Sequence, residues 1–157
     1  METININLEI QVYKYDELSE TDRILVEKAR QATYRSYAPY SHFSVGAAIM
    51  LDNGEIIEGS NQENVAYPSG TCAERSACFY AGARYPEAKF EAIAIAARGT
   101  DGEFTTGPTA PCGACRQALL EYETLAQHNV RVLLAARDKV YILPSVTSTL
   151  PLAFTDF

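Results

Sequence analysis

The sequence contains no tryptophan, no run of lysine or arginine and no long stretch of apolar residues. A membrane-spanning helix needs about 20 consecutive apolar residues, so nothing in the chain predicts membrane insertion. The N-terminal residues Met1-Glu2-Thr3 also lack the basic and apolar regions of an export signal. We therefore expect a cytoplasmic protein, in which the four cysteines stay reduced and can serve as metal ligands.

Positive charge is scarce, because 13 lysines and arginines stand against 20 aspartates and glutamates and give a net charge of -7 at pH 7. Such a chain repels phosphate groups unless a local basic patch overcomes the field, and no basic run offers one. The charge balance therefore weighs against nucleic acids and nucleotides as partners. It favours an uncharged small molecule.

The length and the hydrophobic content are those of one globular domain. The chain has 157 residues, of which 47% are hydrophobic and 21% charged, and it contains no repeat, linker or low-complexity segment. Apolar and polar residues alternate from Ile4 to Tyr15, which is typical of a half-buried strand. We divide the chain into an N-terminal extension over residues 1–18, predicted to contain this strand, and a domain over residues 19–157.

Three cysteines and one glutamate carry the strongest chemical signal. Cys72 and Glu74 lie two positions apart, and a proline introduces the Cys-x-x-Cys pair of Cys112 and Cys115 further along the chain. This pattern resembles that of zinc deaminases, with cysteine in place of the first histidine. A structural zinc site uses four protein ligands, whereas a catalytic site keeps one position open for water. Three cysteines therefore predict a catalytic zinc.

The spacing places both ligand groups at the start of helices. Cys112 and Cys115, three apart on one helical face, can bind the same ion. Cys72 and Glu74 would point about 200° apart inside a helix, so they converge only if Cys72 stands at its N-terminus. Two helix dipoles, and Arg75 as a donor to the sulfurs, would offset the negative charge of three thiolates. Glu74 is then free to move protons between water, substrate and leaving group.

A redox pair and a structural zinc site would each account for only part of the cysteine pattern. A thioredoxin-type redox pair would use Cys112 and Cys115 but leave Cys72 and Glu74 without a role. A structural site with Cys78 as the fourth ligand is disfavoured, because Cys78 lies about 600° round a helix from Cys72. Cys78 is better interpreted as a small buried apolar residue.

Periodicity and turn signals predict alternating strands and helices. Ser19 and Asp22 resemble a capping box, and Asp52-Asn53-Gly54 is typical of a hairpin turn. The predicted helices span residues 19–36, 72–85, 112–122 and 145–150, and the predicted strands span 43–51, 55–58, 90–98, 130–136 and 139–143. The expected fold is a three-layer α/β/α sandwich around a mixed sheet of about five strands, with segment 4–15 as an edge strand or an extension.

Four segments in order resemble the small, homotetrameric cytidine deaminases. They are residues 37–48, 61–67, 72–75 and 111–117, and the resemblance extends from about Ser19 to Phe154. It implies one zinc ion per subunit and the hydrolytic deamination of cytidine and deoxycytidine to uridine and deoxyuridine with release of ammonia, a step of pyrimidine salvage. In this family the residue matching Glu74 contacts the ring nitrogen and shuttles protons.

The same resemblance implies roles for residues around the zinc motif. Phe43 would stack on the pyrimidine, Asn61 and Glu63 would bind the ribose hydroxyls, and Tyr67 belongs to the same loop. The backbone of Ala73 would lie near the base carbonyl. Without the resemblance, Phe43 could be a core residue, and Asn61 and Glu63 could be ordinary loop residues.

The C-terminal segment 150–154 is similar to the family's Leu-Pro-x-Ala-Phe segment, in which the phenylalanine reaches the active site of a neighbouring subunit. Phe154 is therefore a candidate site residue in trans, and a homotetramer is expected. The sequence departs from the family pattern before residue 19, in the 68–71 loop and in the long 99–110 loop. These departures could change access or substrate preference.

Two further functions are compatible with the sequence. The same zinc chemistry could act on a pyrimidine-like antibiotic, as in blasticidin deaminases. A catalytically silent zinc-binding domain would hold the metal and deaminate no nucleoside. Glu74 argues against the silent domain, because a purely structural site has no use for an unliganded carboxylate.

Overall fold

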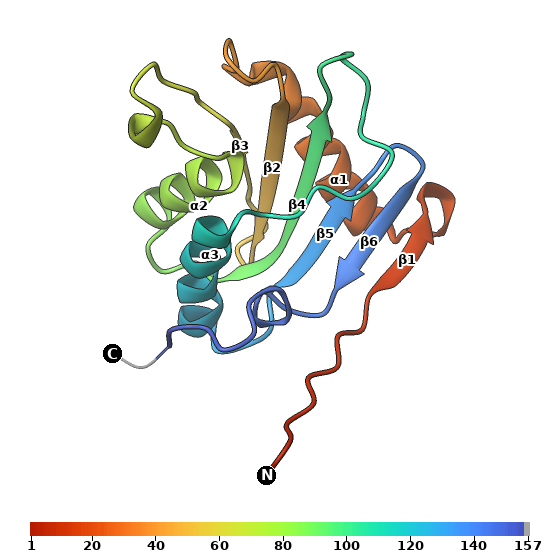
Figure 1. The fold of residues 1–157 in the computed structure, drawn as a ribbon, viewed down its shortest axis with the longest axis vertical. Coiled ribbons are helices and arrows are strands. Elements are labelled where there is room, and N and C mark those ends of the chain that lie inside the picture. The colour runs from red at the N-terminus through yellow and green to blue at the C-terminus, as the bar shows by residue number, and fades with distance from the viewer. Residues whose placement is uncertain (156–157) are drawn as a thin grey trace.

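The computed structural model describes residues 1–155, and its middle layer is a six-stranded mixed sheet (Figure 1). The sheet order is β1-β6-β5-β4-β2-β3, in which β4 and β5 are parallel and all other neighbours antiparallel. The strands are β1 (Gln11–Lys14), β2 (Ser44–Leu51), β3 (Ile56–Ser60), β4 (Phe90–Arg98), β5 (Arg131–Ala135) and β6 (Lys139–Leu143). The predicted fold class is confirmed, but the predicted number of five strands is wrong.

The sixth strand is β1, at the edge of the sheet. Of the predicted segment 4–15, only Gln11–Lys14 pairs, antiparallel to β6, with Gln11 opposite Ile142. The pairing stops near Pro144, because proline has no N–H to donate to a neighbouring strand. Residues 1–10 project from the body as an extended trace (Figure 1). The proposed division of the chain at residue 18 stays a prediction, and its end at residue 157 lies outside the described residues.

Three helices form the outer layers: α1 (Glu20–Ala32) on one face of the sheet, and α2 (Ala73–Arg84) with α3 (Gly113–Ala126) on the other (Figure 1). Ser19 caps α1, because its Oγ accepts the N–H of Asp22 at 3.1 Å. The predicted helix 19–36 is α-helical only to Ala32 and continues as a 3-10 turn, Thr33–Arg35. The predicted helix 145–150 is a single 3-10 turn, Thr147–Thr149. Within residues 1–155, no helix has the length and apolarity that a membrane crossing requires.

Strand β4 contributes side chains to two apolar clusters, one on each face of the sheet. Its isoleucines, Ile93 and Ile95, belong to the apolar cluster under α2 and α3, whereas its alanines at 92, 94 and 96 belong to the cluster under α1. All five side chains are fully buried, as expected for a strand covered on both faces. On the neighbouring strand β2, Gly46 allows α1 to lie close to the sheet, because a Cβ at this position would clash with the carbonyl oxygen of Ala29.

A buried glutamate on α3 holds the C-terminal part of the chain. Glu123 is 7% exposed, and its carboxylate accepts the backbone N–H groups of Val130, Val146 and Thr147 at 2.7–2.9 Å. It also accepts the hydroxyl of Thr147. One side chain therefore fixes the start of β5 and the 3-10 turn that precedes the C-terminus.

Replacing Glu123 with alanine should destabilise the fold by about 2 to 4 kcal/mol, because each buried N–H left without an acceptor costs about 1 to 3 kcal/mol. Urea denaturation followed by circular dichroism measures this change. Glu121→Ala, at an exposed position of the same helix, should stay within about 0.5 kcal/mol of the wild type. Equal midpoints for the two variants would contradict the anchoring role.

Candidate active site

The three predicted zinc ligands lie together at the N-termini of two helices. Cys72 is the N-cap of α2, Cys112 is the N-cap of α3, and Cys115 is buried in the first turn of α3. Their Sγ atoms lie within 4.8 Å of one another, with 3.8 Å between Cys72 and Cys112 and 3.4 Å between Cys112 and Cys115. Both ligand groups therefore begin helices, as the spacing predicts.

The geometry of the three sulfurs fits zinc. Zinc–thiolate bonds of about 2.3 Å in a tetrahedral arrangement put neighbouring sulfurs about 3.8 Å apart, close to the observed separations. The remaining cysteine, Cys78, is fully buried in the core under α2 and does not join the cluster. Three protein ligands leave one tetrahedral position for water, which is the arrangement of a catalytic site.

Arg75 contacts this cluster from the first turn of α2. Its Nη2 donates to the Sγ of Cys72 at 3.9 Å, and its buried Nε has no partner among the described residues. A guanidinium group at this place offsets part of the negative charge of the thiolates. The predicted contact between Arg75 and the sulfurs is thus present, while its effect on a bound metal stays a prediction.

The cysteines of the cluster differ in how readily their thiols lose a proton. A hydrogen bond with the thiol of Cys115 lowers the pKa of Cys72 to about 5, although burial acts in the opposite direction, and Arg75 adds to the lowering. The same hydrogen bond, together with burial, raises the pKa of Cys115. Burial also raises the pKa of Glu74, which is 4% exposed, and the negative charge of Cys72 reinforces this effect.

Zinc affinity should therefore fall as the pH is lowered. Cys72 is a thiolate at neutral pH, but the proton on Cys115 must leave when the metal binds. Each proton released on binding raises the dissociation constant about tenfold for each pH unit lost. Competition with a chromophoric chelator between about pH 8 and about pH 6 measures this slope. A dissociation constant that does not change with pH would contradict it.

A close approach between β3 and α2 sets the position of the ligand-bearing turn. A Cβ on Gly59 would meet the N of Ala77 at 2.5 Å and the carbonyl oxygen of Ala73 at 2.6 Å. Any larger residue at position 59 would therefore push the first turn of α2 away from the sheet. Since that turn contains Glu74 and directly follows Cys72, a glycine on β3 controls the position of both.

A cavity of about 500 Å³ opens beside Cys72, within the size range of small-molecule sites. Its lining includes five of the predicted site residues: Asn61, Glu63, Tyr67, Cys72 and Arg75. Five more predicted residues, Phe43, Ala73, Glu74, Cys112 and Cys115, do not line it. Ala73 and Glu74 are buried directly after Cys72, whereas Phe43 is half-buried just before β2.

Glu63 is held in place by the segment that precedes Phe43. Its carboxylate accepts the backbone N–H groups of Tyr40 and Ser41 at 2.9 and 3.3 Å, and also the hydroxyl of Ser41. The hydrogen bonds from the Ser41 hydroxyl and the Tyr40 backbone lower the pKa of Glu63. The side chain therefore stays charged and can still accept a hydroxyl group of a ligand.

Asn61 links β2 to the cavity. Its Nδ2 donates to the carbonyl oxygen of Phe43 at 2.9 Å, and its Oδ1 accepts the N–H of Val45 at 2.8 Å and the hydroxyl of Ser36. Two accepted hydrogen bonds use the capacity of the amide oxygen. One N–H of Asn61 is left for a ligand, so this residue can donate to a ribose hydroxyl but not accept from one.

Three positioning residues were not predicted from the sequence. Ser36 and Ser41 hold Asn61 and Glu63. Arg116 donates from Nε to the carbonyl oxygen of Pro111 at 2.8 Å and from Nη1 to that of Thr149 at 2.7 Å. Ser41 and Arg116 lie inside the family-like segments 37–48 and 111–117, which is the one signal that could have indicated them, but most of their partners are distant in the sequence.

Tyr67 and Phe154 are both largely exposed, at 76% and 70%. Tyr67 lies on the rim of the cavity, with its ring edge-to-face to Tyr40 at a centroid distance of 6.0 Å. Phe154 does not line the cavity of its own chain, and Gln117 Nε2 donates to its carbonyl oxygen at 2.9 Å. The structure therefore brings Tyr67 to the site and leaves Phe154 outside it.

Comparisons with known proteins agree on one family. The model of the cytidine and deoxycytidylate deaminase zinc-binding region matches residues 19–129. A cytidine deaminase from Halalkalibacterium halodurans is 38% identical over 133 residues, which cover 85% of this chain and 93% of the relative. One from Mycobacterium tuberculosis is 41% identical over 106 residues, covering 66% of this chain and 74% of the relative.

Solved structures give the same result for the fold. The crystal structure of cytidine deaminase from Burkholderia pseudomallei has a TM-score of 0.70 and 38% sequence identity, and the match covers 87% of this chain and 100% of that chain. The crystal structure of cytidine deaminase from Mycobacterium tuberculosis has a TM-score of 0.69 and 30% identity, with coverage of 88% and 99%.

Proposed function

Because this chain belongs to the cytidine and deoxycytidylate deaminase family, we propose that it hydrolyses cytidine and deoxycytidine to uridine and deoxyuridine with release of ammonia. Zinc-dependent deamination of cytidine is the general function of this family. The observation that carries the proposal is the cluster of Cys72, Cys112 and Cys115 at two helix N-termini, next to a buried glutamate and a cavity of nucleoside size.

The three cysteines would hold the zinc, and Glu74 would move the protons. When bound, zinc supplies Lewis acidity, which makes a water molecule more acidic. Glu74 would accept a proton from water and deliver protons to the ring nitrogen and to the departing amine. Its pKa, raised by burial, suits this role because proton transfer is most efficient when the pKa of the catalytic group is near the operating pH.

The reaction needs no redox partner. The oxygen of water adds to C4 of the pyrimidine, the bond between C4 and the exocyclic nitrogen breaks, and the nitrogen leaves as ammonia after it has received a proton. The carboxylate of Glu63 and the free N–H of Asn61, which both line the cavity, would bind the ribose hydroxyls. A charged carboxylate there also disfavours a nucleotide phosphate, in agreement with the net charge of -7.

The assembly and the location are further parts of the proposal. A homotetramer would bring Phe154, which is exposed in the single chain, to the active site of a neighbour. Gln117 on α3 donates a hydrogen bond to the backbone carbonyl of Phe154, which ties this part of the C-terminal segment to the body of the chain. A cytoplasmic location stays a prediction from the sequence.

Ultraviolet-monitored deamination tests the function. The purified protein should convert cytidine and deoxycytidine and leave free cytosine largely unchanged, since cytosine has no ribose for Glu63 to bind. Prolonged incubation with a strong chelator should abolish turnover, and added zinc should restore it. Turnover of blasticidin in place of cytidine would favour the antibiotic deaminases, and zinc binding without any deamination would favour a silent domain.

Phe43→Ala should raise the KM for cytidine about tenfold with a smaller change in kcat, because an aromatic contact contributes about 0.5–1.5 kcal/mol beyond burial. Phe43→Leu keeps the apolar volume but removes the ring, so it should show a similar KM if stacking is the cause. Steady-state kinetics and thermal unfolding of both variants separate the two roles. Unchanged KM values with a lower melting temperature would place Phe43 in the core.

A further inference from the structure

The N-terminal arm, residues 1–10, lies outside the region that the family model matches. The family model begins at residue 19, and the solved deaminase from Burkholderia pseudomallei is matched over 100% of its length by 87% of this chain. The side chains of the arm itself indicate its role.

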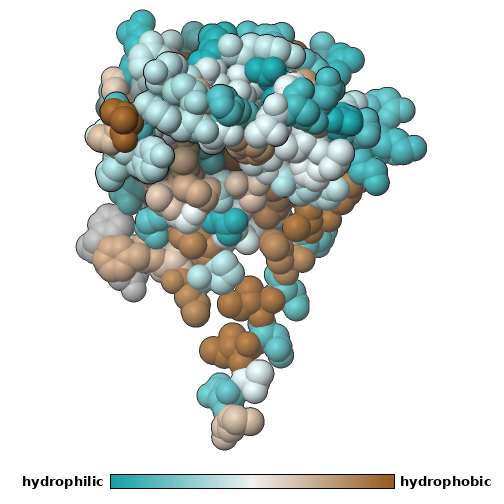
Figure 2. All heavy atoms as spheres, turned by 45° about the horizontal axis from the view of Figure 1, so that its top comes forward, coloured by the Kyte–Doolittle hydropathy of each residue, from teal (hydrophilic) through white to brown (hydrophobic). Residues whose placement is uncertain are grey.

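The arm carries an unbroken apolar stripe. Ile4, Ile6, Leu8, Ile10 and Val12 alternate with polar residues, and their exposed fractions lie between 44% and 86%. Figure 2 shows the arm projecting from the body, with hydrophobic and hydrophilic residues in alternation along it. Single exposed apolar residues are normal on a protein surface, but a contiguous apolar patch marks an interaction site.

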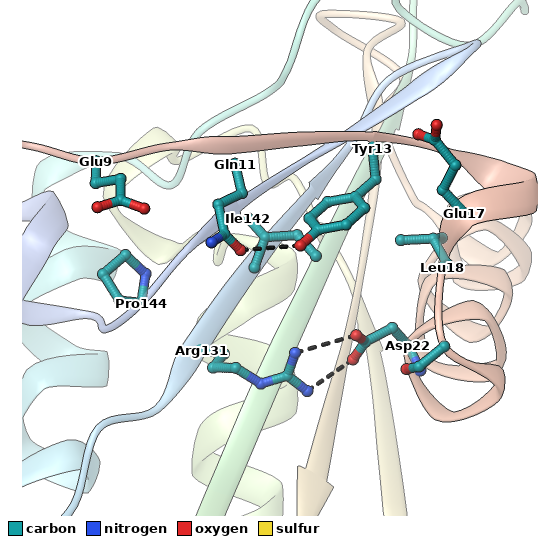
Figure 3. Close-up of a pocket in the computed structure, with 10 residues that line it drawn as sticks. Glu9, Gln11, Tyr13, Glu17, Leu18, Asp22, Arg131, Ile142 and Pro144 are labelled. Atoms are coloured by element: carbon teal, nitrogen blue, oxygen red, sulfur yellow. Dashed lines mark hydrogen bonds and ion pairs between the residues drawn. The ribbon is translucent and has the colours of Figure 1, made fainter.

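The root of the arm shows which way the two sets of side chains point. Glu9, Gln11 and Tyr13 point into a cavity of about 530 Å³ over the ion pair between Asp22 and Arg131 (Figure 3). The polar set therefore faces the α1 side of the sheet. Because successive side chains of an extended chain point to opposite faces, the apolar stripe faces the α2 and α3 side.

That side of the sheet is not covered at its β1 edge. Val12 pairs with Tyr141 of β6, so the two side chains share a face. Tyr141 packs against the core under α2 and α3, but Val12 remains 50% exposed. The apolar stripe thus continues the inner surface of the sheet into solvent, and β1 also has one free edge for backbone hydrogen bonds.

We propose that the apolar stripe is a contact surface for a second copy of this chain, in which the stripes of two copies pack against each other about a two-fold axis. Residues 3–8 carry no charge, so two arms can meet without repulsion although each chain has a net charge of -7. A two-fold contact uses the same patch on both partners, and an aliphatic stripe is complementary to itself.

Charge argues against a membrane or a nucleic acid on the stripe. The arm contains Glu2 and Glu9 but no lysine or arginine before Lys14. An anionic membrane surface or a nucleic acid is bound through basic residues beside the apolar ones, which the arm lacks. The inference does not depend on the proposed reaction, because none of the stripe residues lines the cavity beside Cys72.

Matched double variants of the full chain test the contact. Ile6→Asp with Leu8→Asp adds two charges to the stripe, whereas Asn5→Asp with Asn7→Asp adds the same charge to the opposite side of the arm. In sedimentation velocity over a range of concentrations, the stripe variant should dissociate at a concentration at least about tenfold higher than wild type, since buried unpaired charges are costly at an interface. The polar-side variant should sediment like the wild type. Identical sedimentation of all three proteins would overturn the proposal.

Site-specific photo-crosslinking tests the identity of the partner. A photoreactive amino acid at position 8, in a mixture of isotopically labelled and unlabelled chains, should give covalent dimers of mixed label, with the link at residues 4–12 or Tyr141 of the second copy. The same group at position 53, in the exposed hairpin turn, should give none. Links confined to one chain, or no links, would overturn the proposal. Cytidine turnover, measured on the same samples, tests the proposed function separately.

Discussion

Replacement of Glu74 by glutamine is expected to lower kcat for cytidine between about 100-fold and about 10,000-fold, the range that a positioned proton-transfer group contributes. Glutamine has nearly the same size, so it fits the buried site that Glu74 occupies at 4% exposure. Its amide cannot take a proton from water or give one to the amine. Ammonia release and the loss of ultraviolet absorbance measure kcat, and the zinc content and melting temperature report on the integrity of the site.

Glu87→Gln is the matched control, because Glu87 is exposed and lies just after α2. This variant should retain wild-type turnover. If Glu74→Gln folded, bound zinc and turned over cytidine at the rate of the control, Glu74 could not be the proton shuttle. If it lost its zinc as well, the carboxylate would instead contribute to holding the metal.

Cys115→Ala should reduce bound zinc from about one ion per chain to nearly none and abolish turnover, because two remaining thiolates cannot complete a three-ligand site. Cys115 is the buried member of the cluster, and its Sγ lies 3.4 Å from that of Cys112. Atomic absorption on protein purified without added metal measures the stoichiometry. Addition of excess zinc should not restore turnover in this variant.

Cys78→Ala separates a ligand from a core residue. Cys78 is fully buried between α2 and the sheet, and burial raises the pKa of its thiol to about 12, which disfavours the thiolate that a metal needs. The Cys78→Ala variant should keep one zinc and its turnover, with a loss of about 1 kcal/mol in stability for the removed volume. Loss of zinc from the Cys78→Ala variant would instead support a structural site in which Cys78 is the fourth zinc ligand.

Local signals in the sequence predicted most of the secondary structure. The hairpin turn at Asp52-Asn53-Gly54, the strand Phe90–Arg98 and the strand Lys139–Leu143 follow from turn residues and hydrophobic periodicity, and the structure confirms them. The errors lie at the chain ends. Segment 4–15 pairs only where β6 has backbone groups to offer, and segment 145–150 forms a single turn because Glu123 takes up its N–H groups.

Some residues of the candidate site could likewise be predicted from local sequence signals, and others could not. The spacing of Cys72, Glu74, Cys112 and Cys115 predicted a metal and a base at helix starts, because helical geometry lets these side chains converge only there. Sequence periodicity could not predict Ser36, Ser41 or Arg116, since a hydrogen bond between residues far apart in the chain leaves no local pattern. Nor could it predict that Gly59 on β3 sets the position of the turn that bears Glu74.

The sequence by itself therefore indicated the family and predicted the metal ligands and the proton shuttle, because each depends on residue types at short, fixed spacings. Only the tertiary structure decided toward which side of the sheet the N-terminal segment turns its polar and its apolar side chains. Alternation predicts that one face of a strand is apolar, and a core would normally cover that face. Here β6 pairs with β1 so that Glu9, Gln11 and Tyr13 line a cavity on the α1 side, whereas the isoleucines stay exposed.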